Sequence, residues 1–300
     1  MGEVLLKLLP VVIAMAGGFT LRRIGLVDQR DGESVFKLVF YVFLPAVMFT
    51  SLSTVTLERR FAIYPAAAVV VIAAGYLGGR LVAARAKFNP VEAAVLLSGC
   101  MIVNTGFQLP FVQVLYGADG VARIAAFDIV NTTTTFTLAY LMAVRGNPVH
   151  GGGSVLLGRL VKSPALYAIG AGLLVNLTGV AVPAAIADPF AKFGAVTAVV
   201  IPIGIGILFD PLGGSLRKAG LIVVTRLVTG LIVAGAIVVV LGLSGVDRTV
   251  LLLIGAAPLV FAVVTFASLE NLDVRLATNA LSLSLGVSLV LSLLIILVTA

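Results

Sequence analysis

The chain alternates between long apolar segments and short polar connections over its whole length. Ten apolar segments approach the length of about 17–25 residues that a helix needs to cross a bilayer. They occupy residues 4–21, 35–52, 61–83, 91–115, 122–144, 160–180, 190–209, 219–243, 249–268 and 274–299. The segments are continuously apolar, whereas a strand of a membrane barrel alternates over about ten residues. The pattern predicts an all-α integral membrane protein with ten transmembrane helices.

The composition excludes an ordinary soluble fold. The chain is 60% hydrophobic and 11% charged, whereas soluble domains are about 45–50% apolar and about 25% charged. The net charge of +7 would suggest nucleic-acid binding in a soluble protein. Here the basic residues lie between apolar segments, where membrane topology explains them. We therefore expect a lipid bilayer around the protein and no nucleic-acid partner.

Lysine and arginine are distributed unevenly between alternate connections. One set of connections carries thirteen of these residues: Arg22, Arg23, Arg30, Lys37, Arg80, Arg85, Lys87, Arg145, Arg159, Lys162, Arg217, Lys218 and Arg275. The other set carries six: Lys7, Arg59, Arg60, Arg123, Lys192 and Arg248. Basic connections favour the cytoplasmic side. The distribution therefore predicts a multi-pass protein of the cell (cytoplasmic) membrane with both termini outside the cytoplasm.

A short Gly-rich connection divides the chain into two halves of five predicted helices. The connection covers residues 145–159, and the halves are residues 1–144 and 160–300. Their first helices are similar, with Pro10 aligned to Pro164. Because five is an odd number, the second half must enter the membrane from the opposite side. The pattern predicts two inverted five-helix repeats, and chance similarity between Gly- and Ala-rich helices is the alternative.

The fourth segment carries polar residues in its apolar centre, namely Asn104, Thr105, Gly106 and Gln108, just before Pro110. Proline breaks a helix interior but suits the first turn of a new helix. An interrupted membrane helix is tolerated only where it is buried or lines a cavity. We therefore predict two half-helices, the second beginning at Pro110, whose positive end and neighbouring amides bind an anion. The alternative is that Asn and Gln only bond between helices.

The ninth segment offers a counterpart, because Pro258 follows Gly255, Ala256 and Ala257 in an apolar stretch. This second break has almost no polar side chains, so ligand contacts would come mainly from its backbone. The candidate substrate-binding residues are therefore Asn104, Thr105, Gly106, Gln108, Pro110, Ala257 and Pro258.

Two further positions place charge inside apolar segments. Asp128 and Asn131 lie one helical turn apart in the fifth segment. A carboxylate within the membrane is costly and marks function, so this pair is a candidate site for coupling to protons or sodium. The alternative is that Asp128, close to Arg123, lies at the solvated surface. Arg226 lies within the eighth segment, and we expect it to snorkel towards the cytoplasmic surface rather than pair inside the bundle.

Motifs of enzymes and metal centres are missing from the sequence. It contains no HExxH, GxSxG or GxxxxGK[ST] pattern and one cysteine, Cys100. These patterns carry metal-dependent hydrolysis, nucleophilic catalysis and nucleotide binding. We therefore predict no enzyme, no catalytic residues, no metal site and no cofactor.

The stretch NTGFQLP, followed by LYGADGVARIAAFDIVN, resembles the auxin efflux carrier family. The similarity covers nearly the full length and includes AAPLVFAV in the ninth segment. It implies two inverted repeats in which the broken helices four and nine cross and hold an organic anion, and often a homodimer. It also implies a substrate region with fifth-segment neighbours, comprising Asn104, Gly106, Pro110, Pro258, Asp128 and Asn131.

Departures from the family pattern bear on the substrate. Gln108 and Leu109 stand where family members commonly have a Gly-Leu pair, and the third segment lacks the acidic residue of the plant carriers. The short central connection is typical of a bacterial-type member. We therefore expect a small mono- or dicarboxylate, such as malonate or malate, rather than auxin.

The predicted function is that of a secondary transporter that moves a small organic anion by alternating access. The alternatives are a sodium-coupled bile-acid-type symporter and a membrane sensor or assembly protein without transport. The expected partners are the organic anion, Na⁺ or H⁺ as a coupling ion, the lipid bilayer and a second copy of the chain.

Overall fold

The computed structural model describes residues 2–54, 59–147, 164–209 and 216–299. Within these ranges the chain forms helices and no strand. Four helical segments are long and apolar enough to cross a membrane, namely Ile63–Arg85, Pro90–Gly146, Leu216–Val240 and Val274–Thr299. Shorter apolar helices cover Tyr41–Thr54, Tyr167–Thr178 and Val199–Leu208. The all-α prediction is confirmed, with several candidate membrane spans.

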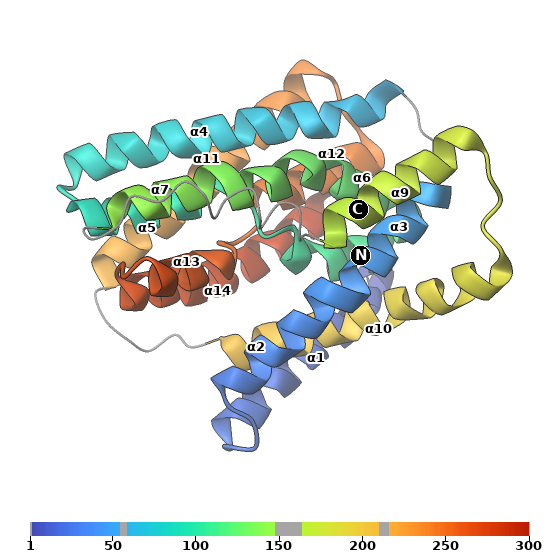
Figure 1. Cartoon of the computed structure of the whole chain (residues 1–300), viewed down its shortest axis with the longest axis horizontal. Helices are drawn as coiled ribbons and strands as arrows, with labels where there is room; N and C mark the ends of the chain where they lie inside the picture. The colour runs from blue at the N-terminus through green and yellow to red at the C-terminus, as the bar shows by residue number, and fades with distance from the viewer. Residues whose placement is uncertain (1, 55–58, 148–163, 210–215, 300) are drawn as a thin grey trace.

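The helices form two groups, and the smaller group combines elements from the two halves of the sequence. We call it the small bundle; it comprises α1 (Gly2–Arg23), α2 (Gln29–Leu38), η1 (Val39–Phe43), α3 (Leu44–Thr54), α9 (Pro164–Thr178) and α10 (Ala184–Leu208). Helix α1 packs along α10, and α3 packs against α9 and α10. The small bundle occupies the lower right of Figure 1.

The remaining helices form the large bundle. It comprises η2 (Arg59–Ala62), α4 (Ile63–Arg85), α5 (Pro90–Met101), α6 (Thr105–Thr134), η3 (Thr135–Ala139), α7 (Tyr140–Gly146), α11 (Leu216–Val240), α12 (Gly245–Gly255), α13 (Ala262–Leu269) and α14 (Val274–Thr299). Helix α6 also contacts α1, α3, α9 and α10. The large bundle extends across the top and left of Figure 1, and α6 joins it to the small bundle.

The predicted apolar segments correspond in order to these helices, although several of them are interrupted. The fourth predicted segment contains α5 and the first part of α6, and the fifth contains the rest of α6 with η3 and α7. Gly117 separates these two parts of α6 with φ of 56°, a backbone conformation that glycine adopts without steric cost. The predicted connection at 145–159 lies largely outside the described residues.

Glycines allow two continuous helices to approach the carboxyl ends of two short ones. A Cβ atom on Gly75 of α4 would collide with the carbonyl oxygen of Cys100 at the end of α5. A Cβ atom on Gly230 of α11 would collide with the carbonyl oxygen of Gly255 at the end of α12. Membrane helices commonly use small residues for such close backbone contacts. The two contacts fix the ends of α5 and α12 within the large bundle.

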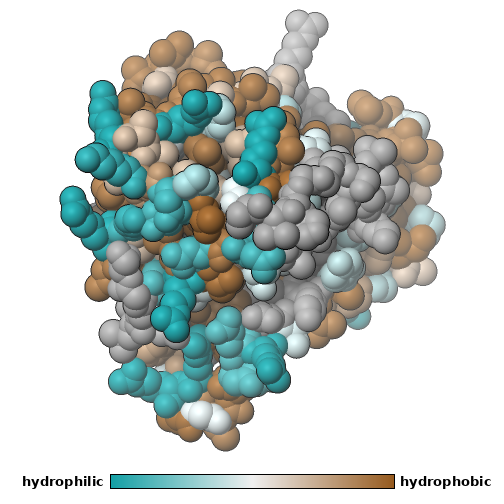
Figure 2. All heavy atoms as spheres, turned by 60° about the vertical axis from the view of Figure 1, so that its left-hand side comes forward, coloured by the Kyte–Doolittle hydropathy of each residue, from teal (hydrophilic) through white to brown (hydrophobic). Residues whose placement is uncertain are grey.

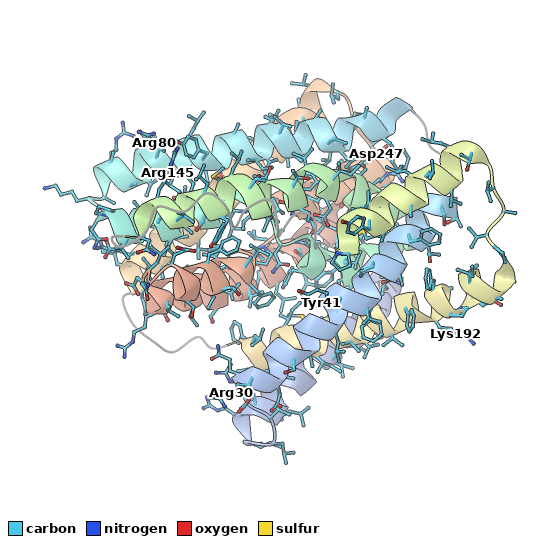
Figure 3. The ribbon with its side chains drawn as sticks, in the orientation of Figure 1. Arg30, Tyr41, Arg80, Arg145, Lys192 and Asp247 are labelled. Atoms are coloured by element: carbon cyan, nitrogen blue, oxygen red, sulfur yellow. The ribbon has the colours of Figure 1, made fainter. Side chains whose placement is uncertain are left out.

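Charged side chains gather at the two ends of the molecule. Figure 3 shows Arg80 and Arg145 at the upper left, Arg30 at the bottom, and Asp247 and Lys192 towards the right. Figure 2 brings the left-hand end of Figure 1 forward and shows hydrophilic side chains gathered there, with hydrophobic side chains around them. A protein that spans a bilayer needs this separation, because its flanks face lipid and its two ends face water.

Each end also carries an ion pair that joins the start of a short helix to its neighbours. The Nζ atom of Lys218 lies 2.6 Å from both carboxylate oxygens of Glu92, in the first turn of α5. At the other end, Arg123 Nε donates to Asp247 Oδ1 over 2.6 Å, in the first turn of α12. The hydroxyl of Tyr64 donates to the same oxygen over 2.6 Å. These pairs hold the outer ends of α5 and α12.

The glycine contact between α4 and α5 predicts a stability change. We expect Gly75→Ala to lower the free energy of unfolding by about 1–3 kcal/mol, because the added methyl group would push against backbone atoms. The chain has no tryptophan and one cysteine, and Cys100 is buried. A thiol-reactive dye therefore reports thermal unfolding of the purified protein through Cys100.

Gly235→Ala is the matched control, because no atom lies within 4 Å of a Cβ at that position of α11. We expect this variant to be as stable as the wild type or slightly more stable, since alanine favours helices. Equal stability of Gly75→Ala and the wild type would contradict the close contact.

Candidate functional site

The fourth predicted segment is interrupted next to Asn104. Helix α5 ends at Met101 and α6 begins at Thr105. Asn104 caps the new helix, because its Oδ1 accepts a hydrogen bond from the Phe107 amide over 3.1 Å. The predicted interruption is confirmed, but the prediction that the second half-helix begins at Pro110 is wrong. Pro110 lies inside α6, since the cap at Asn104 already starts the helix at Thr105.

The ninth predicted segment is interrupted around Pro258. Helix α12 ends at Gly255 and α13 begins at Ala262. Proline disfavours the helical conformation of the residue before it, here Ala257, so the helix cannot continue through this point. Ala257 and Pro258 are both buried. The predicted counterpart break is confirmed at the predicted residues.

The two breaks meet, and Asn104 bonds them together. Its backbone amide donates to the carbonyl oxygen of Pro258 over 3.3 Å. Its side-chain Nδ2 donates to the carbonyl oxygen of Leu259 over 3.1 Å. From the other side, the Ser284 hydroxyl of α14 accepts a hydrogen bond from the Leu259 amide over 3.1 Å. We call this meeting point of residues 102–105 and 256–260 the crossing.

Asn131 supports the first break from the far part of α6. Its Oδ1 accepts from the Val103 amide over 3.0 Å, and its Nδ2 donates to the Val103 carbonyl over 3.0 Å. The side chain therefore pairs with both backbone polar groups of Val103, and the Thr105 amide donates a second hydrogen bond to the Val103 carbonyl over 3.0 Å. Because Asn131 is buried, these bonds are made without competition from water.

Asp128 lies within the same network. The Thr105 hydroxyl is 2.9 Å from both carboxylate oxygens of Asp128, and Asn131 Nδ2 is 3.0 Å from Oδ1. Asp128 is 4% exposed, which contradicts the alternative that it is solvated at the surface. The structure therefore places a carboxyl group directly beside the amino end of α6.

The amino end of α6 is open to approach at Gly106. Gly106 is partly exposed, and a Cβ there would have only Asn104 Oδ1 nearby, at 3.5 Å. Its amide is one of the N–H groups that a helix start leaves without an intrahelical acceptor. This end of the helix also carries a partial positive charge. An anion can therefore meet backbone donors at this position.

Gln108 and Pro110 are not brought into the crossing. Gln108 is fully buried and its Nε2 lies 3.0 Å from the Ser292 hydroxyl of α14. This contact matches the alternative that a polar side chain bonds between helices. The candidate residues that the structure does bring together are Asn104, Thr105, Asp128, Asn131 and Pro258, with Gly106 and Ala257 adjoining them.

Arg226 was expected to snorkel, and this prediction is wrong. Its side chain is fully buried, and its Nη2 lies 3.4 Å from the carbonyl oxygen of Ile254 near the end of α12. The signal available in the sequence was Gly230, one turn later, which leaves room for the side chain between two helices.

The groups at the crossing suit the reversible binding of a small anion. Among the residues that the structure describes, no group of three or more His, Cys, Asp or Glu side chains could hold a metal ion. The crossing instead presents a helix amino end, amide groups and one carboxyl group. Such features bind a small anion and exchange a proton.

Two comparisons with known proteins show what the whole chain is similar to. A family model described as "Membrane transport protein" matches residues 3–297. The chain is also 27% identical, over 292 residues, to an "uncharacterized transporter" of Methanothermobacter thermautotrophicus, and the match covers 94% of each chain.

The support that Asn131 gives to the first break can be tested. We expect Asn131→Ala to lower the melting temperature, because it leaves the buried amide of Val103 unpaired, at a cost of about 1–3 kcal/mol. Thr133→Ala is the control, since Thr133 is exposed and its hydroxyl donates to the Ile129 carbonyl of its own helix. Dye labelling of Cys100 during heating gives the measurement. An unchanged melting temperature of Asn131→Ala would show that the break holds without this side chain.

Proposed function

Because the chain belongs to the membrane transport protein family, which includes the auxin efflux carriers, we propose that it carries a small organic anion across the cell membrane. The anion is a mono- or dicarboxylate, and the mechanism is alternating access by a secondary transporter. Membership of a transporter family also agrees with the prediction that the chain is not an enzyme.

The observation that carries this proposal is the crossing of two interrupted helices at Asn104. Transporters commonly bind their substrates where interrupted helices meet near the middle of the membrane, and the amino ends of half-helices point at anionic groups. Here the amino end of α6 is approachable at Gly106, and Asn104 joins it to Pro258 and Leu259 of the other break. A carboxylate bound at Gly106 would accept backbone hydrogen bonds beside the Asn104 side chain.

Asp128 favours coupling to protons. An anion at the amino end of α6 and an ionised Asp128 would repel each other strongly in a site of low dielectric constant. Protonation of Asp128 removes this repulsion, so the anion and a proton bind more favourably together than separately. The Oδ1 atom of Asn131 accepts a hydrogen bond from the Val103 amide, so this oxygen is poorly placed to coordinate sodium. The result is symport of a proton with the anion.

The two bundles provide the parts for alternating access. The crossing lies within the large bundle, and α6 is its principal contact with α1, α3, α9 and α10 of the small bundle. We propose that the large bundle carries the site past the small one. The matching contacts of Gly75 with Cys100 and of Gly230 with Gly255, which have the same spacing in sequence, support two inverted five-helix repeats.

The orientation follows from the separation of charge between the two ends. Arg80 and Arg145 lie towards the same end of the molecule (Figure 3), and this more basic end faces the cytoplasm in our proposal. Both termini then lie outside the cytoplasm. A homodimer, which the family resemblance implies, completes the proposed assembly in the bilayer.

Gly106→Val tests the proposed binding site. We expect malonate or malate to raise the melting temperature of the wild type by mass action, and the neutral compound malonamide to leave it unchanged. The added side chain should lower carboxylate affinity by about tenfold or more, which corresponds to the loss of one hydrogen bond to a charged group.

The matched control for this test is Gly235→Val on α11, where the surroundings are also open and no ligand is expected. Its carboxylate response should equal that of the wild type. A carboxylate shift that survives in Gly106→Val would move the site elsewhere, and no shift with any carboxylate tested would contradict an anionic substrate.

Asp128→Asn tests coupling to protons. In proteoliposomes, an inward proton gradient should stimulate uptake of radiolabelled malonate by the wild type. The variant should lose this stimulation but keep exchange of internal for external malonate, because the amide mimics the protonated carboxyl group. Asp119→Asn is the control, since Asp119 lies in the same helix and pairs with Arg123 away from the crossing. Stimulation by sodium instead of protons, lost in Asp128→Asn, would replace proton coupling by sodium coupling.

A further inference from the structure

Arg226 is a buried cation that forms no ion pair with any carboxylate in the described part of the chain. It is the largest of the fully buried side chains in the part of the chain that the structure describes. Its Nη2 lies 3.4 Å from the Ile254 carbonyl, while Nε and Nη1 have no hydrogen-bond partner among the described residues. Charged groups inside a membrane protein are costly and are retained mainly for function. We therefore expect Arg226 to have a specific role in the protein.

The buried carboxylates of the large bundle are engaged elsewhere. Asp128 bonds to Thr105 and Asn131, and Asp247 bonds to Arg123 and Tyr64. Glu270 bonds to the Tyr140 hydroxyl and to Asn147. Among the residues that the structure describes, the negative charge next to Arg226 comes from the helix backbone.

Two helix carboxyl ends supply this negative charge. Helix α12 ends at Gly255, next to the Ile254 carbonyl that Arg226 contacts. Helix α5 ends at Met101, and the Cys100 thiol lies 3.8 Å from the Ile222 carbonyl, one turn before Arg226 on α11. The carboxyl end of a helix carries a partial negative charge of about half an elementary charge. Arg226 thus lies where the ends of both short helices converge.

The close contact between α11 and α12 leaves space for the guanidinium group of Arg226. A Cβ atom on Gly230 would collide with Arg226 Nη1 as well as with the Gly255 carbonyl. The matching contact of α4, at Gly75, has the apolar and buried Val71 one turn before it. The two short helices are held by similar glycine contacts, but only α11 adds a cation.

In transporters built from interrupted helices, the carboxyl ends of half-helices and nearby carbonyl groups commonly coordinate a sodium ion. We propose that Arg226 is a built-in cation that takes the place of such an ion at the ends of α5 and α12. The second break then keeps its shape without bound sodium, and transport is independent of sodium. This inference rests on the proposed function for transport, but its effect on stability can be measured without a substrate.

The first arm of the test uses the wild-type chain. The purified protein is heated in chloride salts of sodium, potassium or N-methyl-D-glucamine at equal ionic strength, with unfolding followed through Cys100. We expect the same melting temperature in all three salts. A saturable rise that is specific to sodium would overturn the proposal, because it would show that a sodium site exists beside the built-in charge.

The second arm replaces Arg226 by residues of matched size. Arg226→Lys keeps the charge and should retain most of the wild-type stability, whereas Arg226→Met removes the charge and should lower the melting temperature by several degrees. Arg80→Met is the control, since Arg80 is an exposed cation of α4 that bonds to Tyr76. Equal stability of the Met and Lys variants would overturn a role for the charge.

Chemical rescue distinguishes charge from simple packing. Arg226→Ala leaves the carbonyl groups near Ile254 without their cation, so guanidinium or sodium at millimolar concentration should raise its melting temperature saturably by mass action. Potassium and N-methyl-D-glucamine serve as controls. No rescue by either cation would count against the proposal, and the wild-type salt series still decides the question if the variant does not fold.

The two proposals fail in different ways. If malonate uptake and binding are absent while the salt and rescue results hold, then the substrate assignment is wrong and the role of Arg226 stands. If malonate uptake occurs but requires sodium in the wild type, then transport stands and the built-in cation is wrong.

Discussion

The structure depends on the rule that backbone polar groups within a bilayer must find partners inside the protein. Helices satisfy this rule along most of the chain, and the two interruptions in the large bundle break it. Side chains and the opposite break restore the missing bonds: Asn131 holds Val103, Ser284 holds Leu259, and Asn104 joins both breaks. Each break therefore depends on the other, and this dependence explains why two segments about half the chain apart must meet at one point.

The helix ends created at the breaks determine which charges can be buried there. The amino end of α6 carries a partial positive charge. The carboxyl group of Asp128 lies beside it, where it accepts a hydrogen bond from the Thr105 hydroxyl. The carboxyl end of α12 is negative, and the guanidinium of Arg226 lies beside it. In both places the sign of the side chain is the one that the helix end stabilises. In a bundle of uninterrupted helices, burying these two charged residues would cost free energy. The helix ends at the breaks stabilise both charges, so the breaks make their burial possible.

Much of the architecture could be predicted from apolar periodicity, whereas the details of the site required the folded chain. Segment lengths and prolines were sufficient to indicate helices and to locate the second break at Pro258. The start of α6 at Thr105 was missed because a proline signal was given more weight than the cap formed by Asn104. The burial of Arg226 was not predicted because its environment depends on how α12, the next helix along the chain, packs against α11. Side-chain contacts between distant segments leave little trace in a single sequence.

The contrast between Gln108 and Asn104 shows why a polar residue in a membrane segment does not by itself define a binding site. Both are buried amides near the same break, four positions apart on α6 or its cap. Gln108 is paired with Ser292 of α14, and Asn104 is paired with Leu259 and Phe107, so both side chains are used within the fold. Asn104 lies at the start of the helix and adjoins the open position at Gly106. The helix terminus, rather than polarity alone, therefore distinguishes a residue that can contact a ligand from one that stabilises packing.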